Sequence, residues 1–578
     1  MDTKRIRKGG LPFVPNLRDY DEMRRQFTWQ QIAGELDWFD EEHINIAHIA
    51  VDAHLKTDRR TKKALIWEGK KGEVEEYTFE DLARLSNRFA NVLVEQAGVV
   101  KGDRVFFFLD RVPEIFIGIL GTLKAGGVIG PLFCAFGPEA VKDRMADAGA
   151  KVLVTSPGLK KRIAGILPDL PALEKVILVH RGREAEPSED LSYEEAMAGA
   201  SEVFEIVRTH GEDHAIMHYT SGTTGKPKGA VHVHAAVQGH FATARYVLDL
   251  GQDDVYWCTA DPGWVTGTSY GMFGPWSNGV TQVVYEGGFS ASRWYGFLEK
   301  WKVTVWYTAP TAIRMLMKSG DELPGKFDFA SLRYMCSVGE PLNPEAVVWG
   351  DRIFGKPFHD NWWQTETGSI MIANYPVQDV KPGSMGRPFP GIEAGIVDDE
   401  FRELPAGQEG HLALRPGWPS MFRTYWQKDD LYASLFKEGW YISGDKAKMD
   451  EEGYFWFVGR ADDVINTAGH LVGPFEVESV LIEHPAVAEA GVIGKPDPIA
   501  MEVIKAFVSL KEGIEPSDEL RLDIKKFVMK RLAAAATPRE IDFLPSLPKT
   551  RSGKIMRRLL KARELGLPLG DTSTLEDD

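Results

Sequence analysis

Short hydrophobic runs alternate with helical patterns through the first part of the chain. Residues 105–109, 151–155 and 175–180 are apolar runs with the length and composition of buried strands. Apolar positions over 78–93 recur every three or four residues, and Pro113 stands where a helix can begin without losing a hydrogen bond. Such alternation is typical of a mostly parallel sheet with helices on both faces. The pattern therefore predicts an α/β fold.

The alternation continues toward the middle of the chain. Strand-like runs occupy residues 215–219, 255–258, 303–307 and 332–338, and apolar positions over 237–248 mark one face of a helix. In α/β proteins, ligands bind in the loops that connect a strand to the following helix. The loop between the strand at 215–219 and this helix is therefore a candidate binding site.

A short polar segment, Gly459-Arg460-Ala461-Asp462-Asp463, predicts a domain boundary. The residues after it have their own pattern of strands and helices, which would make a small α+β unit of ordinary domain size. We therefore expect a large N-terminal domain, residues 1–461, with layered, mostly parallel sheets and helices. A short hinge would join it to a small, mobile α+β C-terminal domain, residues 462–578.

Composition restricts the class of protein. With 43% hydrophobic and 26% charged residues among 578, the chain has the balance of a soluble globular protein. Its net charge of −16 argues against nucleic-acid binding. Cys134, Cys258 and Cys336 form no CxxC motif, so neither a disulfide framework nor a cysteine zinc site is indicated, and a reducing, cytoplasmic setting fits.

One apolar run, residues 115–136, approaches the length of a membrane span. Lys124 lies near its middle, and several glycines and Pro131 interrupt it. We expect this run to form buried core, and we expect no membrane span.

The most distinctive stretch is residues 219–229, YTSGTTGKPKG. Its glycines allow backbone N–H groups to turn inward, and concave arrangements of N–H groups bind anions. Its hydroxyls and two lysines add donors for a polyphosphate. The stretch is not a Walker A loop, because Pro227 follows Lys226 where that motif has Ser or Thr. We predict a phosphate-binding loop, with a flexible, solvated turn as the alternative.

A second candidate stretch is residues 360–368, DNWWQTETG. Adjacent tryptophans can line an apolar pocket or stack on a base. Glu366 offers oxygen to a hard cation such as Mg²⁺.

Histidines are frequent between 210 and 240, and His210, His214 and His218 are spaced four residues apart. Such spacing on one helix could hold zinc. The strand-like run into Tyr219 argues against a helix there, and no glutamate stands between the histidines as in HExxH. A zinc site is therefore the weaker interpretation.

Residues 267–271, GTSYG, match the GxSxG motif of serine hydrolases. That motif requires a strand that ends at its first glycine, whereas residues 261–264 interrupt the chain after the strand at 255–258. A glycine-rich turn is favoured, and a serine esterase using Ser269 remains the alternative function of another class.

A basic cluster at residues 548–558 stands out in this acidic chain. It lacks the interleaved aromatic residues of a single-strand binder, so contact with a phosphorylated ligand suits it better.

These motifs are long and occur in a fixed order, and with them the sequence resembles the AMP-forming acetyl-CoA synthetases (acetate–CoA ligases). This family lies within the adenylate-forming superfamily of acyl-CoA synthetases, luciferases and peptide-synthetase adenylation domains, and the resemblance extends over residues 19–575. It implies an enzyme that joins acetate to CoA through an acetyl-adenylate, with ATP, AMP, Mg²⁺ and coenzyme A as ligands.

The resemblance also implies roles for individual residues. Nucleotide contacts fall on Thr220, Ser221, Gly222, Thr223, Thr224, Gly225, Lys226, Gly339, Glu340, Pro341, Asp360, Asn361, Trp362, Trp363, Gln364, Thr365, Asp445 and Arg460. The acetate pocket falls on Val265, Thr266, Val338 and Trp363, and the CoA channel on Ala309, Ala468 and Gly469.

The remaining implied roles concern catalysis and movement. Glu366 would hold the Mg²⁺ of ATP, and Lys554 would contact the carboxylate and the α-phosphate, with Glu366 and Thr365 as further catalytic residues. Asp462 would be the hinge. Ile482, His484 and Val487 would form a peripheral Mg²⁺ site, and Lys554 would be the target of a lysine acetyltransferase and deacetylase.

One position departs from the family pattern, because Leu471 stands where an arginine usually contacts the nucleotide phosphate. A ligase for propionate or another short acid remains an alternative within the same class.

Overall fold

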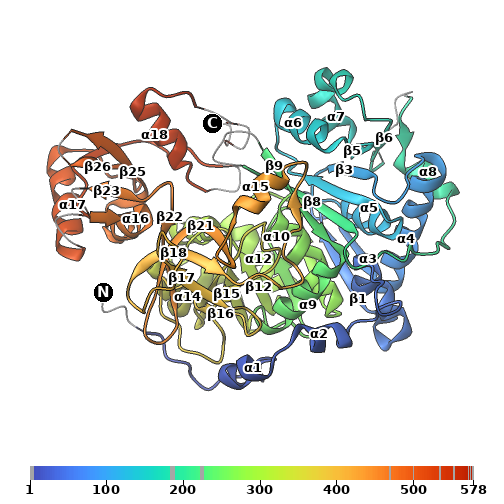
Figure 1. The fold of residues 1–578 in the computed structure, drawn as a ribbon, viewed down its shortest axis with the longest axis horizontal. Coiled ribbons are helices and arrows are strands. Elements are labelled where there is room, and N and C mark those ends of the chain that lie inside the picture. Colours follow the sequence, from blue (N-terminus) through green and yellow to red (C-terminus); the bar gives the residue numbers. More distant parts are fainter. Residues whose placement is uncertain are drawn as a thin grey trace.

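The computed structural model describes residues 5–182, 189–221, 227–467, 470–498, 500–532, 536–550, 554–569, 572 and 575. Figure 1 shows a large lobe built from most of the chain and a smaller lobe, at the left, built from its C-terminal part. The small lobe contains α16 (Pro474–Glu483), α17 (Asp518–Arg531) and α18 (Arg557–Leu565).

The largest sheet has nine strands, and its central six run parallel. In order across the sheet they are β16 (Arg387–Pro388), β15 (Ile372–Ala373), β14 (Phe358–Trp362), β13 (Tyr334–Ser337), β12 (Val305–Thr308), β10 (Val255–Cys258), β11 (Thr281–Tyr285), β1 (Lys63–Glu68) and β2 (Val74–Thr78). The outer strands β2, β15 and β16 pair antiparallel.

The second sheet has eight strands and is also mostly parallel. Its order is β19 (Thr424–Tyr425), β9 (Pro227–Val233), β8 (His214–Ser221), β4 (Val128–Leu132), β3 (Arg104–Phe108), β5 (Val152–Thr155), β6 (Lys175–Leu178) and β7 (Leu191–Ser192). Both parallel sheets confirm the predicted α/β class.

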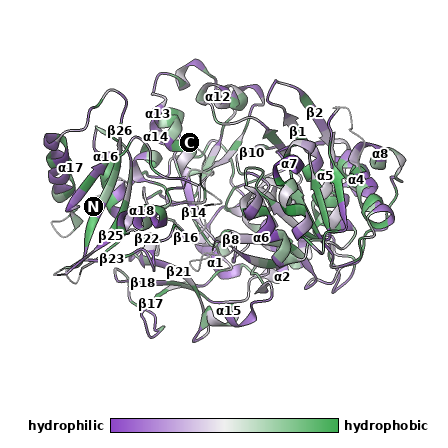
Figure 2. Ribbon diagram, turned by 90° about the horizontal axis from the view of Figure 1, so that it is seen from above, coloured by the Kyte–Doolittle hydropathy of each residue, from purple (hydrophilic) through white to green (hydrophobic). Residues whose placement is uncertain are grey.

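Helices α4 (Phe79–Asn91) and α5 (Pro113–Lys124) share one hydrophobic core with strands of both sheets, including Trp67 of β1 and Phe107 of β3. Nearly all of α5 is buried, and Figure 2 shows hydrophobic colours along it but mainly hydrophilic colours on α17. Burial of these apolar faces provides the main driving force for joining the two sheets.

The start of each of these helices follows from its sequence. Thr78 caps α4, and its side chain and that of Asp81 form a reciprocal capping box. Pro113 is the first residue of α5, as predicted. The other helices of the large lobe are α1 (Tyr20–Gln26), α2 (Trp29–Glu35), α3 (Ile46–Ala50), α6 (Pro138–Ala148), α7 (Pro157–Ile163), α8 (Tyr193–Gly199), α9 (Val237–Tyr246), α10 (Val265–Thr268), α11 (Gly274–Ser277), α12 (Ala291–Lys300), α13 (Pro310–Lys318), α14 (Pro344–Phe354) and α15 (Asp429–Ser434).

The run at residues 115–136 forms most of α5 followed by β4, both buried. Lys124 is buried with its ammonium group 2.8 Å from Asp52. Within the described part of the chain, no helix has the length and apolar character needed to cross a bilayer.

The predicted connection after the strand at 215–219 is wrong. β8 is followed by β9, which pairs with it antiparallel, and helix α9 begins only beyond β9. The candidate phosphate loop therefore connects two paired antiparallel strands rather than a strand and a helix. β9 is buried along nearly its whole length, as expected for a strand that pairs with β8 inside the fold.

A third sheet of the large lobe is entirely antiparallel, which the sequence patterns did not predict. It contains β17 (Ala394–Val397), β18 (Glu409–Leu414), β21 (Trp440–Met449), β20 (Phe436–Lys437) and β22 (Phe455–Arg460). Its last strand, β22, leads directly into the small lobe.

The small lobe has its own five-stranded sheet and its own core. The strands are β24 (His470–Val472), β23 (Ile465–Thr467), β26 (Met501–Leu510), β25 (Val487–Asp497) and β27 (Glu540–Phe543). Gly473 brings α16 against β22, because a Cβ atom on it would lie 2.1 Å from the Val458 carbonyl oxygen. Only glycine permits this approach.

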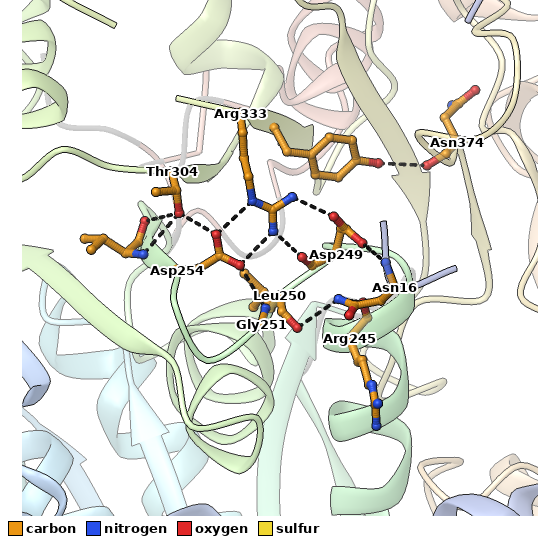
Figure 3. A network of polar contacts seen from close by, with 11 residues as sticks. Asn16, Arg245, Asp249, Leu250, Gly251, Asp254, Thr304, Arg333 and Asn374 are labelled. Atoms are coloured by element: carbon orange, nitrogen blue, oxygen red, sulfur yellow. Dashed lines mark hydrogen bonds and ion pairs between the residues drawn. The ribbon is translucent and has the colours of Figure 1, made fainter. Parts of the chain in front are cut away.

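A polar cluster holds together the starting ends of β10, β12 and β13 (Figure 3). The Arg333 guanidinium donates to Asp254 and Asp249, and Thr304 donates to Asp254. Asn16 N donates to Asp249 Oδ1 at 2.6 Å, which ties the N-terminal segment to the same cluster. Burial raises the pKa of Asp249 to about 6, and Arg333 opposes this shift. The cluster anchors the end of the sheet opposite to the candidate site.

Candidate functional site

The predicted site residues gather beyond the C-terminal ends of β12, β13 and β14. Ala309, Val338 and Trp363 are the residues that directly or almost directly follow these neighbouring strands. Ligands of α/β proteins bind at this edge of a parallel sheet. The antiparallel sheet adds Asp445 and Arg460, which are paired across β21 and β22.

Asp445 is the centre of a buried polar cluster. Its Oδ2 accepts hydrogen bonds from Trp362 Nε1 at 2.9 Å and Gln364 Nε2 at 3.2 Å. Arg460 Nη1 lies 3.3 Å from Oδ1. Burial raises the pKa of Asp445, and Arg460 opposes the shift most strongly. Oδ1 accepts no hydrogen bond from the described residues, so it can accept one from a ligand hydroxyl.

Asp360 and Asn361 present further unsatisfied polar atoms at the end of β14. Asp360 Oδ1, Asn361 Nδ2 and Ser337 Oγ are buried without hydrogen-bond partners among the described residues. Burial raises the pKa of Asp360 well above its usual range. Glu340, beside them, forms an ion pair with Arg314 Nη2 at 3.0 Å. Buried polar atoms without partners are expected where a polar ligand completes the site.

Glu366 lies in the loop after β14 and is only partly buried. Its Oε1 accepts a hydrogen bond of 2.7 Å from the Tyr425 hydroxyl. The ammonium group of Lys228, at the C-terminal end of the candidate phosphate loop, lies 5.4 Å from the centre of the same tyrosine ring. Tyr425 thus connects the metal-binding candidate with the phosphate loop.

The residues of the predicted acetate pocket come from three neighbouring parts of the fold. Val265 and Thr266 begin α10, and Val338 follows β13. The Trp363 ring lies edge-to-face on Tyr270, which belongs to the helical turn continuing α10, at 5.1 Å between ring centres. The tryptophan therefore stands against the α10 side of the site.

Lys554, from the small lobe, is exposed to solvent, and charged residues of the site affect its pKa. The surrounding protein lowers the pKa of Lys554, and the positive charges of Arg460 and Arg557 lower it further. Glu340 and Asp445 act in the opposite direction. Arg460, Glu340 and Asp445 all belong to the large lobe, so in this arrangement of the lobes the lysine ammonium group lies within the electrostatic influence of these residues.

Several predicted residues fall elsewhere or outside the described part. Gly222, Thr223, Thr224, Gly225, Lys226, Ala468 and Gly469 lie outside the described residues. Ile482, His484 and Val487 lie together at the junction of α16 and β25, where Val487 N donates to His484 O at 3.0 Å. Asp462 lies in the exposed turn between β22 and β23.

The geometry opposes a serine hydrolase. Ser269 begins a buried helical turn rather than following a strand, and it is 2% exposed. Its hydroxyl contacts His240 Nε2 at 3.2 Å and the Gly368 carbonyl at 3.3 Å, deep in the core. A buried serine without a strand-to-helix elbow lacks the exposed nucleophile of that mechanism.

The histidines are distributed over several structural roles. His218 Nε2 contacts Thr268, and His240 Nε2 contacts Gly368 O. His214 and His218 lie on β8, so they do not share a helix face. Among the described residues, no group of three or more His, Cys, Asp or Glu is arranged to hold a metal.

Sequence reasoning missed Tyr425 and Tyr307. The Tyr425 hydroxyl donates to Glu366, which lies 59 residues away in the sequence. The Trp363 indole nitrogen donates to the Tyr307 hydroxyl at 3.3 Å, and these two residues are 56 apart. Neither tyrosine belongs to a motif with a known spacing. Both tyrosines lie on strands beside the site. That position could have identified them only if the order of the strands in the sheets had been known.

The two lobes also meet through acidic side chains. Glu345, in the first turn of α14, faces Glu483, the last residue of α16, and Arg531 Nη2 lies 2.8 Å from Glu483 Oε2. Nearby, Asn343 Nδ2 donates to Ser479 Oγ at 2.9 Å. Burial raises the pKa of Glu345 to about 8, and the Glu483 carboxylate raises it too.

This arrangement of the lobes should weaken as pH rises from about 5 to about 8. When the lobes separate, Glu345 regains water and an ordinary pKa near 4.5. Between the two pKa values the closed arrangement binds the extra proton, so its stability falls with increasing pH. Glu345→Gln should flatten this dependence, measured as the fraction of molecules with the lobes in this arrangement at each pH. Glu400→Gln, an exposed control, should keep the wild-type slope; an unchanged slope in Glu345→Gln would contradict the argument.

Comparison with known proteins relates this geometry to a family. The family model of AMP-binding enzymes matches residues 52–426, and that of the AMP-binding enzyme C-terminal domain matches residues 476–554. The chain is 54% identical to an acetyl-coenzyme A synthetase of Bacillus subtilis (strain 168), over 97% of this chain and 98% of the relative. It is 42% identical to an acetyl-coenzyme A synthetase of Methanothrix thermoacetophila, over 93% of this chain and 86% of the relative.

Solved structures show the same architecture. An acyl-CoA synthetase of Brucella canis, 37% identical, covers 95% of this chain and 99% of its own with a TM-score of 0.74. An anthranilate CoA ligase in complex with anthranoyl-AMP, 30% identical, covers 93% and 99% with a TM-score of 0.83.

Proposed function

Because this chain belongs to the family of AMP-binding enzymes, we propose that it activates acetate with ATP and transfers the acetyl group to coenzyme A. The reaction converts acetate, ATP and CoA into acetyl-CoA, AMP and pyrophosphate through an acetyl-adenylate. The observation that carries this proposal is the 54% identity over nearly the full chain, together with the buried acids and Lys554 at one edge of the sheet.

The chemistry explains why such a site needs positive charge. A carboxylate is a poor acyl donor, because oxide would have to leave. Attack of its oxygen on the α-phosphorus of ATP expels pyrophosphate and produces an acyl-adenylate, a mixed anhydride from which AMP leaves readily. In this step one anion approaches another, so donors and cations that stabilise the transition state supply most of the catalysis.

Different residues would bind the different parts of the substrates. Lys554 lies near the buried acids and would hold the acetate carboxylate and the α-phosphate together. Asp445 would accept hydrogen bonds from the ribose hydroxyls through Oδ1, which forms an ion pair with Arg460 but accepts no hydrogen bond from the described residues. Trp362 donates to Asp445, which fixes the indole beside the position of the base.

Mg²⁺ fits the acidic residue at the phosphate side. Glu366 is partly exposed, and Tyr425 orients one of its oxygens, which are hard ligands of the kind that Mg²⁺ prefers. When bound, the ion would offset the negative charge of the ATP phosphates.

Two further features belong to the same proposal. The small lobe would rotate about Asp462 between the adenylation and thioester-forming steps, because the second step needs a thiol rather than Lys554 at the carbonyl. Acetylation of Lys554 by a lysine acetyltransferase would remove its charge and stop the first step, and a deacetylase would restore it.

Acid-dependent ATP–pyrophosphate exchange tests the function directly. We expect exchange with acetate, weaker exchange with propionate and little with longer acids, and we expect Mg²⁺ chelation to abolish it. A stronger response to propionate would favour the other short-acid ligase. Labelling by a serine-directed inhibitor, with no exchange for any acid, would favour the esterase at Ser269.

Replacing Trp363 should shift the preferred acid. The indole leaves room for a methyl group, since overpacking a site costs ~1–3 kcal/mol. Trp363→Gly should therefore favour longer acids, with kcat/KM for pentanoate rising relative to acetate by at least about tenfold. Equal preference for acetate in the variant and the wild type would show that Trp363 does not limit the pocket.

A further inference from the structure

Two tyrosines contact the Trp363 side chain and fix its position. Its indole Nε1 donates to the Tyr307 hydroxyl at 3.3 Å. Its ring lies edge-to-face on Tyr270, with 5.1 Å between centres and 84° between planes. Tyr270 in turn lies edge-to-face on Tyr307 at 5.8 Å and 88°. The three side chains therefore form a closed triangle, with two ring contacts at Tyr270 and one hydrogen bond between Trp363 and Tyr307.

A residue of β14, the second strand from β12 in the sheet, fixes the Tyr307 hydroxyl. Tyr307 lies on β12 and is fully buried, and its hydroxyl donates to Asn361 Oδ1 on β14 at 2.9 Å. The strand between them is β13. The hydroxyl has one hydrogen to donate and lone pairs to accept with, so it satisfies Asn361 and Trp363 at once.

Tyr270 is fixed in a comparable way from the other side. Its hydroxyl accepts from Ile370 N at 2.7 Å and lies 2.7 Å from Thr243 Oγ1 on α9. Both tyrosine rings are completely buried, whereas Trp363 is only partly so. The tryptophan is thus the exposed corner of a rigid buried cluster.

We propose that Tyr307 is a positioning residue that determines chain-length selectivity by holding the Trp363 indole across the acyl pocket. This inference rests on the proposed function, in which Trp363 limits that pocket. Without the Tyr307 hydroxyl, the indole N–H loses its acceptor and Asn361 loses its donor. The partly exposed ring can then turn aside, and the space that it leaves accommodates longer acids.

Tyr307→Phe tests the inference, because it removes one oxygen and keeps the ring. The ratio of kcat/KM for acetate to that for pentanoate should fall by about tenfold, within the range that one methylene group produces in a pocket. Any change in the KM for ATP through Asn361 is common to all acids and cancels in this ratio, and general damage to the fold would lower kcat/KM for every acid without changing the ratio. An unchanged acid ratio overturns the inference.

Tyr334→Phe is the matched control. Tyr334 is a buried tyrosine of the adjacent strand β13, and its hydroxyl donates to Asn374 O at 3.4 Å rather than toward Trp363. It should keep wild-type selectivity. A loss of selectivity equal to that of Tyr307→Phe would show that any lost tyrosine hydroxyl in this sheet loosens the pocket, which overturns the specific role of Tyr307.

A double-mutant cycle shows whether Tyr307 acts through the tryptophan. In a Trp363→Gly background, Tyr307→Phe should change the acid ratio no further, because the group that it positions is gone. Additive effects overturn the inference. A wild-type protein without acid-dependent exchange would instead refute the proposed function, so the two failures are distinguishable.

Discussion

Lys554→Ala is expected to lose adenylation by about a hundredfold to a thousandfold while keeping thioester formation. Removing a charge-stabilising group from a transition state costs two to three orders of magnitude in comparable sites. Lys554 is close enough to Arg460, Glu340 and Asp445 for their charges to affect its pKa, so its own charge acts on the same region. Acetyl-adenylate supplied with CoA bypasses the first step. The first activity is measured by pyrophosphate exchange and the second by consumption of acetyl-adenylate.

Lys561→Ala is the control for this experiment. It removes the same charge from the same lobe, but Lys561 pairs with Glu502 at 3.4 Å, away from the buried acids. It should retain both activities. Wild-type exchange in Lys554→Ala would mean that the lysine belongs to a solvated basic surface, and equal loss of both activities would point to a folding defect.

The sequence predicted helices and strands correctly where residues within the same segment determine them. Thr78 and Asp81 form the capping box that begins α4, and residues 255–258 form β10 as expected. The hairpin of β8 and β9 was missed because a strand and a helix can both follow a glycine-rich loop. Only the pairing partner of residues 227–233 distinguishes them, and that partner is a property of the sheet.

The candidate site likewise contains residues that the sequence predicted and residues that it did not. A motif singled out Asp360 and Glu366, and the family resemblance added Asp445. The structure places Asp360 and Asp445 at one edge of the sheets with Glu366 in the adjoining loop. The residues that orient them, such as Tyr425 and Tyr307, have no motif of their own. They act through hydrogen bonds between chain segments more than fifty residues apart, which only the folded topology brings together.

Asp462→Pro is expected to lower one half-reaction far more than the other, by restricting the hinge rather than by removing a charge as Lys554→Ala does. Proline fixes φ near −65° and restricts the preceding Ala461, so a hinge at this position would be held in one orientation. Among the described residues, the Asp462 N–H donates no hydrogen bond, so the substitution removes none from this arrangement of the lobes. One half-reaction should fall by about a hundredfold or more relative to the other, since catalytic groups displaced by about an ångström lose activity on this scale.

Two controls isolate the hinge. Asp462→Ala removes the carboxylate and leaves φ free, so it should keep both half-reactions within about threefold of each other. Glu451→Pro places proline in the exposed turn between β21 and β22, within a single sheet, where proline suits the second position of the turn. It should leave the balance unchanged. If Asp462→Pro lowers both half-reactions equally while the protein still melts cooperatively at the wild-type Tm, the lobes do not alternate about this residue.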